Sequence, residues 1–191
     1  MKIYKISRHR IGIDGNGITD LVAMAGCPLS CKYCLNKRLL SEGEAKDVSI
    51  NYLLTRLYED ACYMMATGGG VTFGGGEPLL QYKELIEFAE KKPEWMHMNI
   101  ETSLNVPVGV KELLPYVDEW IIDIKSMNPK IYEDYTGGSY SRMIKNLSLI
   151  GENSRIRVPD IPNYSIDTNI DEAILRRKGF KNIERFEYLI R

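Results

Sequence analysis

The sequence is poor in histidine, and this limits the metal sites that it can build. His9 and His97 are its only histidines, and they stand far apart in the chain. A structural zinc site needs about four nitrogen or sulfur ligands, so such a site here would depend mainly on cysteine. Cysteine is also scarce, with 4 residues, and an intracellular chain uses it for metal binding or catalysis before disulfides.

The sequence also lacks long apolar segments and an excess of charge of either sign. Its longest apolar runs, such as residues 21–25, are far shorter than the roughly 20 residues that cross a bilayer. No apolar signal core follows the N-terminal residues, and the formal net charge is −1. We therefore expect a cytoplasmic protein with no nucleic-acid or membrane partner. Its 191 residues, 44% of them hydrophobic, are expected to form a single domain over residues 1–191.

Three of the cysteines gather in one stretch, Gly26-Cys27-Pro28-Leu29-Ser30-Cys31-Lys32-Tyr33-Cys34. Thiolates in this C-x3-C-x2-C spacing can bind zinc or an iron–sulfur cluster. A zinc site would need a further, remote ligand. A cubane cluster held by these thiolates would keep one iron open for a substrate or a second cofactor. The spacing favours a cluster and leaves zinc as the alternative, and Cys62 is expected to be a packed or inert thiol.

Apolar segments typical of strands alternate with amphipathic segments along the chain. We expect strands near residues 2–7, 21–25, 71–73, 96–102, 119–125, 155–158 and 183–190. Helices are expected at residues 50–64, 79–90, 110–114, 129–135, 140–150 and 170–177. This alternation implies parallel βαβ units, and about six units are too few to close an eight-stranded barrel. The prediction is an α/β fold, a partial (βα)6 TIM-like barrel of parallel strands that is open on one side.

Glycine-rich and polar segments follow the predicted strands, where a barrel places its chemistry. The run Gly74-Gly75-Gly76-Glu77 lets a ligand approach the backbone, and Glu77 can accept hydrogen bonds from an ammonium group. The alternative for this run is a tight turn with Glu77 at a helix N-terminus. Asp123 and Lys125 end a later strand on one face. They indicate either a polar site at the barrel mouth or a structural salt bridge.

Together these segments resemble the radical S-adenosylmethionine (SAM) superfamily. The resemblance implies that Cys27, Cys31 and Cys34 bind a [4Fe–4S] cluster whose open iron binds the amino and carboxylate groups of SAM. It also implies that Tyr33 packs near the adenine and that residues 74–77 hold the amino group. An electron from the cluster would break a carbon–sulfur bond of SAM and release a 5′-deoxyadenosyl radical. The cofactors carry this chemistry, so no catalytic side chain is assigned, and an oxygen-free or protected setting is expected.

Residues 12–190 resemble one group in that superfamily, the activating enzymes of glycyl-radical enzymes, with the pyruvate formate-lyase activating enzyme as the type. Asp123 and Lys125 match its D-x-K motif, and Arg157 matches an arginine near the SAM carboxylate. The cofactor-binding set includes Glu101-Thr102-Ser103, and Glu101, Thr102 and Asp123 match positions that the type uses for a monovalent cation beside SAM. The resemblance implies a glycyl-radical enzyme loop as the protein substrate and a flavodoxin- or ferredoxin-like electron donor.

The sequence departs from the activase pattern at several places. The family opens with D-G-P-G-[IL]-R, where residues 14–19 read DGNGIT. The residue after the third cysteine is commonly His but is Leu35 here, followed by the usual Asn36. The family commonly reads T-N-G after an acidic residue that is Asp in the type, whereas Thr102-Ser103-Leu104 follows Glu101. Two alternatives therefore stay open: a radical SAM enzyme that modifies a small molecule or a peptide, and a cluster-binding module without activity.

Overall fold

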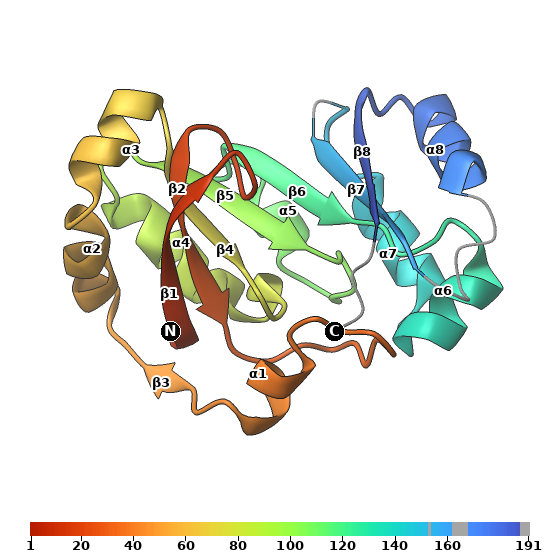
Figure 1. The fold of residues 1–191 in the computed structure, drawn as a ribbon, viewed down its shortest axis with the longest axis horizontal. Coiled ribbons are helices and arrows are strands. Elements are labelled where there is room, and N and C mark those ends of the chain that lie inside the picture. Colours follow the sequence, from red (N-terminus) through yellow and green to blue (C-terminus); the bar gives the residue numbers. More distant parts are fainter. Residues whose placement is uncertain (153, 162–167, 188–191) are drawn as a thin grey trace.

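The strands of the protein form one open, mostly parallel sheet (Figure 1). The computed structural model describes residues 1–152, 154–161 and 168–187. The strand order is β3-β1-β2-β4-β5-β6-β7-β8, and β2 pairs in parallel with β4, as does each later strand with the next. Strand β1 is antiparallel to both β2 and β3. The partial, open barrel is confirmed, although the sequence analysis did not anticipate the antiparallel hairpin of β1 and β2.

The elements follow one another in the predicted alternation. The strands are β1 (Lys2–Ile11), β2 (Ile18–Met24), β3 (Lys46–Asp47), β4 (Gly70–Gly74), β5 (His97–Thr102), β6 (Glu119–Asp123), β7 (Arg155–Asp160) and β8 (Asn182–Glu187). The helices are α1 (Lys37–Glu42), α2 (Ile50–Tyr58), α3 (Ala61–Thr67), α4 (Tyr82–Lys91), α5 (Val110–Leu113), α6 (Pro129–Thr136), α7 (Tyr140–Leu147) and α8 (Thr168–Arg177). A 3-10 turn, η1 (Pro78–Gln81), precedes α4. None of these helices is long and apolar enough to span a membrane.

Several predicted boundaries are wrong. The helix expected over residues 50–64 is two helices, α2 and α3, and the residues between them belong to a polar cluster described below. Cys62 lies on α3 and is exposed rather than packed. Strand β6 ends at Asp123, so Lys125 lies just beyond it. Residues 188–190 of the last predicted strand lie outside the described residues.

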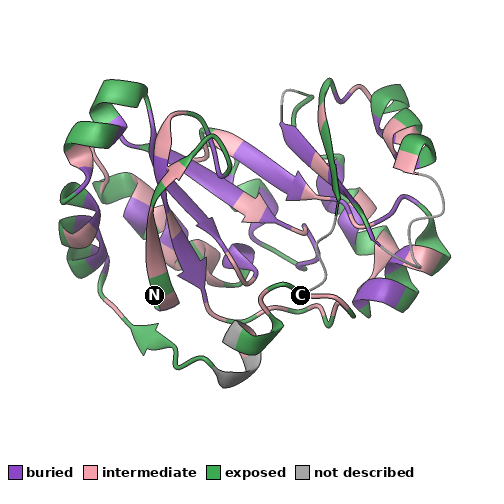
Figure 2. Cartoon of the chain, in the orientation of Figure 1, coloured by how far each residue is buried: buried purple, intermediate pink, exposed green. Residues whose placement is uncertain are grey.

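The core lies between the strands and the helices that cover the outside of the sheet. Figure 2 shows buried residues along the central strands, and exposed residues mainly on the outer sides of the helices. Phe73 of β4 and Phe88 of α4 are both fully buried, and their ring centroids lie 5.0 Å apart. Aromatic pairs of this edge-on kind stabilise a core beyond the area that they bury. This packing anchors the strands whose carboxyl ends carry the polar residues.

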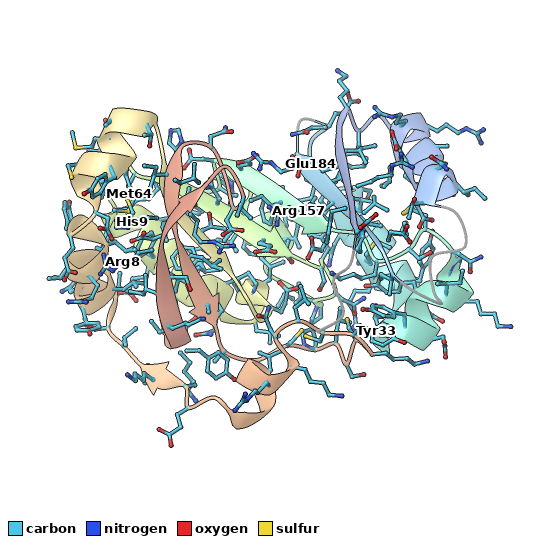
Figure 3. All side chains as sticks on the ribbon, in the orientation of Figure 1. Arg8, His9, Tyr33, Met64, Arg157 and Glu184 are labelled. Atoms are coloured by element: carbon cyan, nitrogen blue, oxygen red, sulfur yellow. The ribbon has the colours of Figure 1, made fainter. Side chains whose placement is uncertain are left out.

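A polar cluster lies outside that core, between the hairpin and the junction of α2 and α3. Figure 3 shows Arg8 and His9 on the side of β1 that faces these helices. The backbone N–H of His9 donates to Asp20 Oδ1 at 3.1 Å, and Nε2 of its ring lies 2.9 Å from Asp60 Oδ1. Arg8 binds Asp60 and also Glu59. These contacts explain why one helix becomes two, because Asp60 is held by β1.

The carboxyl groups of this cluster have shifted pKa values. The Asp20 side chain is fully buried, so burial first, and then its hydrogen bond with Asp60, raises its pKa from 3.8 to about 6. Burial alone would also raise the pKa of Asp60. Its hydrogen bonds with Asp20, Arg8 and His9 outweigh burial and lower that pKa. The folded state therefore favours a proton on Asp20 and a charge on Asp60.

We expect the substitution D20N to change how stability depends on pH. The pKa of Asp20 is higher in the folded than in the unfolded protein. Its contribution to the free energy of unfolding is therefore favourable at low pH and decreases as the pH rises from 3.8 through about 6. D20N removes this titration but keeps an oxygen for the His9 N–H. The free energy of unfolding of D20N relative to wild type should therefore increase by about 1–2 kcal/mol between pH 5 and pH 7.5. Thermal unfolding of the metal-free protein measures this, with E44Q at an exposed carboxylate as the control. Equal pH profiles for D20N and wild type would contradict the assignment.

Candidate functional site

A cavity of about 430 Å³ lies at the carboxyl ends of the parallel strands. Small-molecule sites usually have volumes of roughly 300–1,000 Å³. Residues from widely separated segments line this cavity together, as the sequence analysis predicted. The predicted site residues that line it are Cys27, Cys31, Cys34, Gly75, Gly76, Glu77, Glu101, Thr102, Ser103, Asp123, Lys125 and Arg157. The structure thus brings together nearly all residues of the predicted site.

Two predicted residues, Tyr33 and Gly74, are not among those that line the cavity. The ring of Tyr33 packs beside Tyr135 of α6, with centroids 6.3 Å apart, at the position labelled in Figure 3. Its contact with adenine stays a prediction. Gly74 is buried at the end of β4, where a β-carbon would lie 2.7 Å from Glu101 Oε2. This close approach gives a steric reason for glycine at that position.

The cysteine loop follows β2 and is held on two sides. On one side, the backbone N–H groups of Gly76 and Glu77 donate to Met24 and Gly26 at 3.2 and 2.8 Å. On the other side, the N–H of Ser30 donates to the carbonyl of Thr136, the last residue of α6, at 2.8 Å. A β-carbon on Gly138 would lie 2.4 Å from Leu29 Cδ2, so the chain after α6 also packs closely against this loop. The loop therefore has a defined position between the glycine run and α6.

The three cysteines of the loop are half-buried and suit a metal cluster. Burial raises the pKa of Cys27 to about 11, with Glu77 and the other two thiols adding to the effect, and burial also raises the pKa of Cys31. Such thiols lose their protons to solvent when a positively charged metal centre binds the thiolates. Among the described residues, no three Cys, His, Asp or Glu side chains are placed to hold one metal ion. A cluster does not require that convergence, because each thiolate binds a different iron.

Glu77 is a buried carboxylate that accepts four hydrogen bonds from nearby groups of the protein. It accepts from the hydroxyl of Thr102 at 2.7 Å, from the N–H and hydroxyl of Ser103 at 3.0 and 2.6 Å, and from the N–H of Leu79 at 3.3 Å. Burial raises the pKa of Glu77, and these hydrogen bonds counter the effect. Leu104, the residue after Ser103, is fully buried. Its φ of 59° is a left-handed conformation that is strained for a leucine. The family's T-N-G pattern has glycine at this position, where the conformation costs little.

Acidic and basic side chains line the cavity beside the cysteines. Lys125 Nζ lies 3.2 Å from Asp123 Oδ2, and Arg157 Nη1 lies 3.2 Å from Glu101 Oε1. Burial, followed by the charge of Asp123, raises the pKa of Glu101 to about 7. Asp123 Oδ1 is buried and, in the described part of the chain, has no hydrogen-bond partner. This unfilled acceptor and the ion pairs can bind a ligand that carries both an ammonium and a carboxylate group, as SAM does.

The sequence analysis assigned no site residue to the loop between β1 and β2, of which Ile13 and Asp14 line the cavity. Asp14 is buried, its Oδ2 lies 2.5 Å from Arg10 Nε, and its carbonyl accepts a hydrogen bond from Thr72 of β4. Arg157 also donates to the carbonyl of Ile13 in this loop. Its Nε lies 3.9 Å from Glu184 Oε2 of β8, and both residues are labelled in Figure 3. Gly15 has φ of 128°, and a β-carbon there would lie 2.2 Å from the Asn99 side chain. The sequence signals for this segment were its turn composition over residues 13–19 and its partial match to the opening D-G-P-G-[IL]-R pattern, and neither indicates this packing.

Comparison with known proteins gives a consistent assignment. The sequence pattern of the Radical SAM superfamily matches residues 21–174. The chain is 31% identical over 182 residues to the pyruvate formate-lyase-activating enzyme of Clostridium pasteurianum, covering 93% of this chain and 76% of that protein. It is 38% identical over 165 residues to the (2S)-3-sulfopropanediol dehydratase activating enzyme of Klebsiella oxytoca, covering 79% of this chain and about half, 52%, of that protein.

A solved structure supports the fold. The Streptococcus suis protein SuiB, bound to its precursor peptide SuiA, superposes with a TM-score of 0.68 at 16% identity, covering 88% of this chain and 38% of SuiB. The donor set of the cavity fits a [4Fe–4S] cluster and SAM, the cofactors of the matching superfamily, and the zinc alternative is not supported. On its sequence pattern, its relatives and its fold, the chain belongs to the radical SAM superfamily and is similar to the activating enzymes of glycyl-radical enzymes.

Proposed function

We propose that this enzyme activates a partner protein by removing a hydrogen atom from a glycine α-carbon. One observation carries the proposal: the three cysteines of the loop, residues 75–77, the D-x-K pair and Arg157 line one cavity in a chain similar to two activating enzymes. We further propose that residues 1–191 act as one domain, because the described strands form a single eight-stranded sheet. A cytoplasmic setting protected from oxygen suits the cluster.

The residues of the cavity then have distinct roles. Cys27, Cys31 and Cys34 would hold the cluster, and Gly75, Gly76 and Glu77 the end of SAM that carries its amino group. When bound, the cluster and SAM supply one-electron reductive cleavage, which yields methionine and a 5′-deoxyadenosyl radical. Lys125 and Arg157 would bind the SAM carboxylate, and the unfilled Asp123 Oδ1 would accept a hydrogen bond or contact a monovalent cation. Hydrogen-atom transfer from the glycine would leave a glycyl radical on the partner and 5′-deoxyadenosine in the cavity.

The rim of the cavity supports a protein loop as the substrate. Exposed apolar side chains border the cavity, with exposed fractions of 50% for Ile13, 64% for Leu35 and 37% for Phe186. Lys5 of β1 lines the cavity as well. The wall of the cavity therefore includes residues of the hairpin and, through Phe186, of the last strand, β8. Apolar residues beside a polar site are typical of surfaces that bind other proteins. A flavodoxin- or ferredoxin-like protein would donate the electron.

The substitution F186A is expected to weaken use of the partner without impairing SAM cleavage. Loss of one apolar contact at a protein interface typically reduces affinity by about 3–10-fold. The KM for the partner should rise by that factor, while deoxyadenosine formation without partner should stay at the wild-type rate. The control I170A changes an exposed residue of α8 that is not among those lining the cavity. An unchanged KM for F186A would place the docking surface elsewhere.

The proposed function is tested by anaerobic incubation of the reconstituted enzyme with dithionite, SAM and a glycyl-radical enzyme. Pyruvate formate-lyase and the sulfopropanediol dehydratase are the first candidates, because the relatives' names identify them. A glycyl radical signal in electron paramagnetic resonance, with deoxyadenosine formed in step, is the expected result. Vigorous SAM cleavage without a radical on either protein would favour the small-molecule or peptide alternative. A cluster that never cleaves SAM would favour the binding module.

A further inference from the structure

Asn36 connects the cysteine loop to the glycine run through its side chain. Its Nδ2 donates to the carbonyl of Gly75 at 2.8 Å, and Asn36 itself is half-buried and lines the cavity. The start of the loop is joined to the same run by backbone hydrogen bonds, from Gly76 to Met24 and from Glu77 to Gly26. Backbone hydrogen bonds therefore join the glycine run to the start of the cysteine loop, and the Asn36 side chain joins it to the end of that loop.

The Gly75 carbonyl accepts this side-chain hydrogen bond at a residue whose backbone is easily reoriented. Gly75 has φ of 84°, and glycine changes its backbone conformation more easily than any other residue. The neighbouring Leu35 is 64% exposed, so it contributes little apolar packing that would fix the end of the loop. The Gly75–Gly76 peptide is thus held from both sides: its carbonyl accepts from Asn36 Nδ2 at 2.8 Å, and its N–H donates to Met24 at 3.2 Å.

We propose that Asn36 is a positioning residue that keeps the glycine run in register with the cluster cysteines. This inference rests on the proposed function, in which residues 75–77 receive the amino end of SAM beside the cluster. Asn36 would touch neither the reacting atoms nor the iron. By fixing the Gly75 carbonyl it would present the amino-group site at a constant distance from the loop that holds the cluster.

A second role of Asn36 has to be separated from this one. Asn36 directly precedes α1, and its carbonyl accepts a hydrogen bond from Leu40 at 2.8 Å, so it stands at the N-cap position of that helix. Serine and aspartate are N-caps about as good as asparagine. The shorter hydroxyl of serine does not extend as far as the asparagine amide, and an aspartate carboxylate cannot donate to a carbonyl. N36S and N36D therefore preserve the cap while removing the bond to Gly75.

The test measures SAM binding to the reconstituted, oxidised cluster enzyme, a state in which SAM is not cleaved. N36S and N36D should bind as much iron as wild type, while their dissociation constants for SAM rise by about 5–10-fold. The change that SAM causes in the electron paramagnetic resonance spectrum of the reduced cluster should also become smaller in both. N51S, on the exposed face of α2, is the matched control and should behave as wild type.

Each other outcome has a definite meaning. Wild-type SAM affinity in both variants would overturn the inference and leave Asn36 as a helix cap. Loss of iron from both variants would also overturn it, since Asn36 would then maintain the cysteine loop itself. Failure of the wild-type cluster enzyme to bind SAM would instead refute the proposed function, and the inference with it.

Discussion

Replacing Cys31 by alanine is expected to abolish cluster assembly and SAM cleavage together. Cys31 lines the cavity with Cys27 and Cys34, and each of the three thiolates would hold a different iron of the cluster. Deoxyadenosine formation by C31A should fall by more than about 1,000-fold, a barrier increase of about 4 kcal/mol. Iron and sulfide analysis and the absorbance of the reconstituted protein measure the cluster directly.

The matched control for this prediction is C62A. Cys62 is exposed on α3 and is not among the residues that line the cavity. A zinc site built on the cysteine loop would have needed a remote ligand such as Cys62, whereas the cluster does not. C62A should therefore keep wild-type iron content and wild-type SAM cleavage. Loss of iron from C62A, or zinc in place of iron after anaerobic preparation, would contradict the cluster assignment.

Features that depend on local sequence could be predicted, and features that depend on distant contacts could not. The strand ending in the glycine run and the strand before Asp123 are short apolar segments followed by polar residues, and both appear where expected. The break between α2 and α3 follows from Asp60 binding Arg8, which lies 52 positions away in the chain. No periodicity within residues 50–64 contains that information.

The same distinction separates the residues of the site. The cysteines and residues 75–77 carry a spacing that identifies them, so their convergence on one cavity could be predicted. Asp14, in the loop between β1 and β2, and Arg10 of β1 gain their roles only because the hairpin packs against β4. The link from Asn36 to Gly75 spans 39 positions, and nothing in the local pattern around Asn36 indicates its partner. Such side chains are recognised from coordinates, or from a relative whose structure is known.

Replacing Glu77 by glutamine is expected to weaken SAM binding strongly although the two side chains have nearly the same shape. The carboxylate of Glu77 only accepts hydrogen bonds, and Ser103 donates to one of its oxygens through both N–H and hydroxyl. In E77Q the amide nitrogen replaces one of these oxygens and cannot accept a hydrogen bond. The donors that faced that oxygen then lose their acceptor. The loss of a buried hydrogen bond to a charged group reduces binding by about 10–100-fold. S103A removes one of these donors and should have a smaller effect, about 3–10-fold.

The comparison between SAM affinity and folding stability separates the two interpretations of Glu77. If Glu77 receives the amino group of SAM, E77Q should lose SAM affinity in the cluster-loaded enzyme by more than its loss of thermal stability explains. S103A should then lie between E77Q and wild type in affinity, because it removes only one of the donors that orient the carboxylate. If the glycine run is only a tight turn with Glu77 near a helix N-terminus, the variants should unfold at lower temperature yet bind SAM as wild type does. Equilibrium binding of SAM to all three proteins, with thermal unfolding of the same samples, decides between a ligand site and a structural turn.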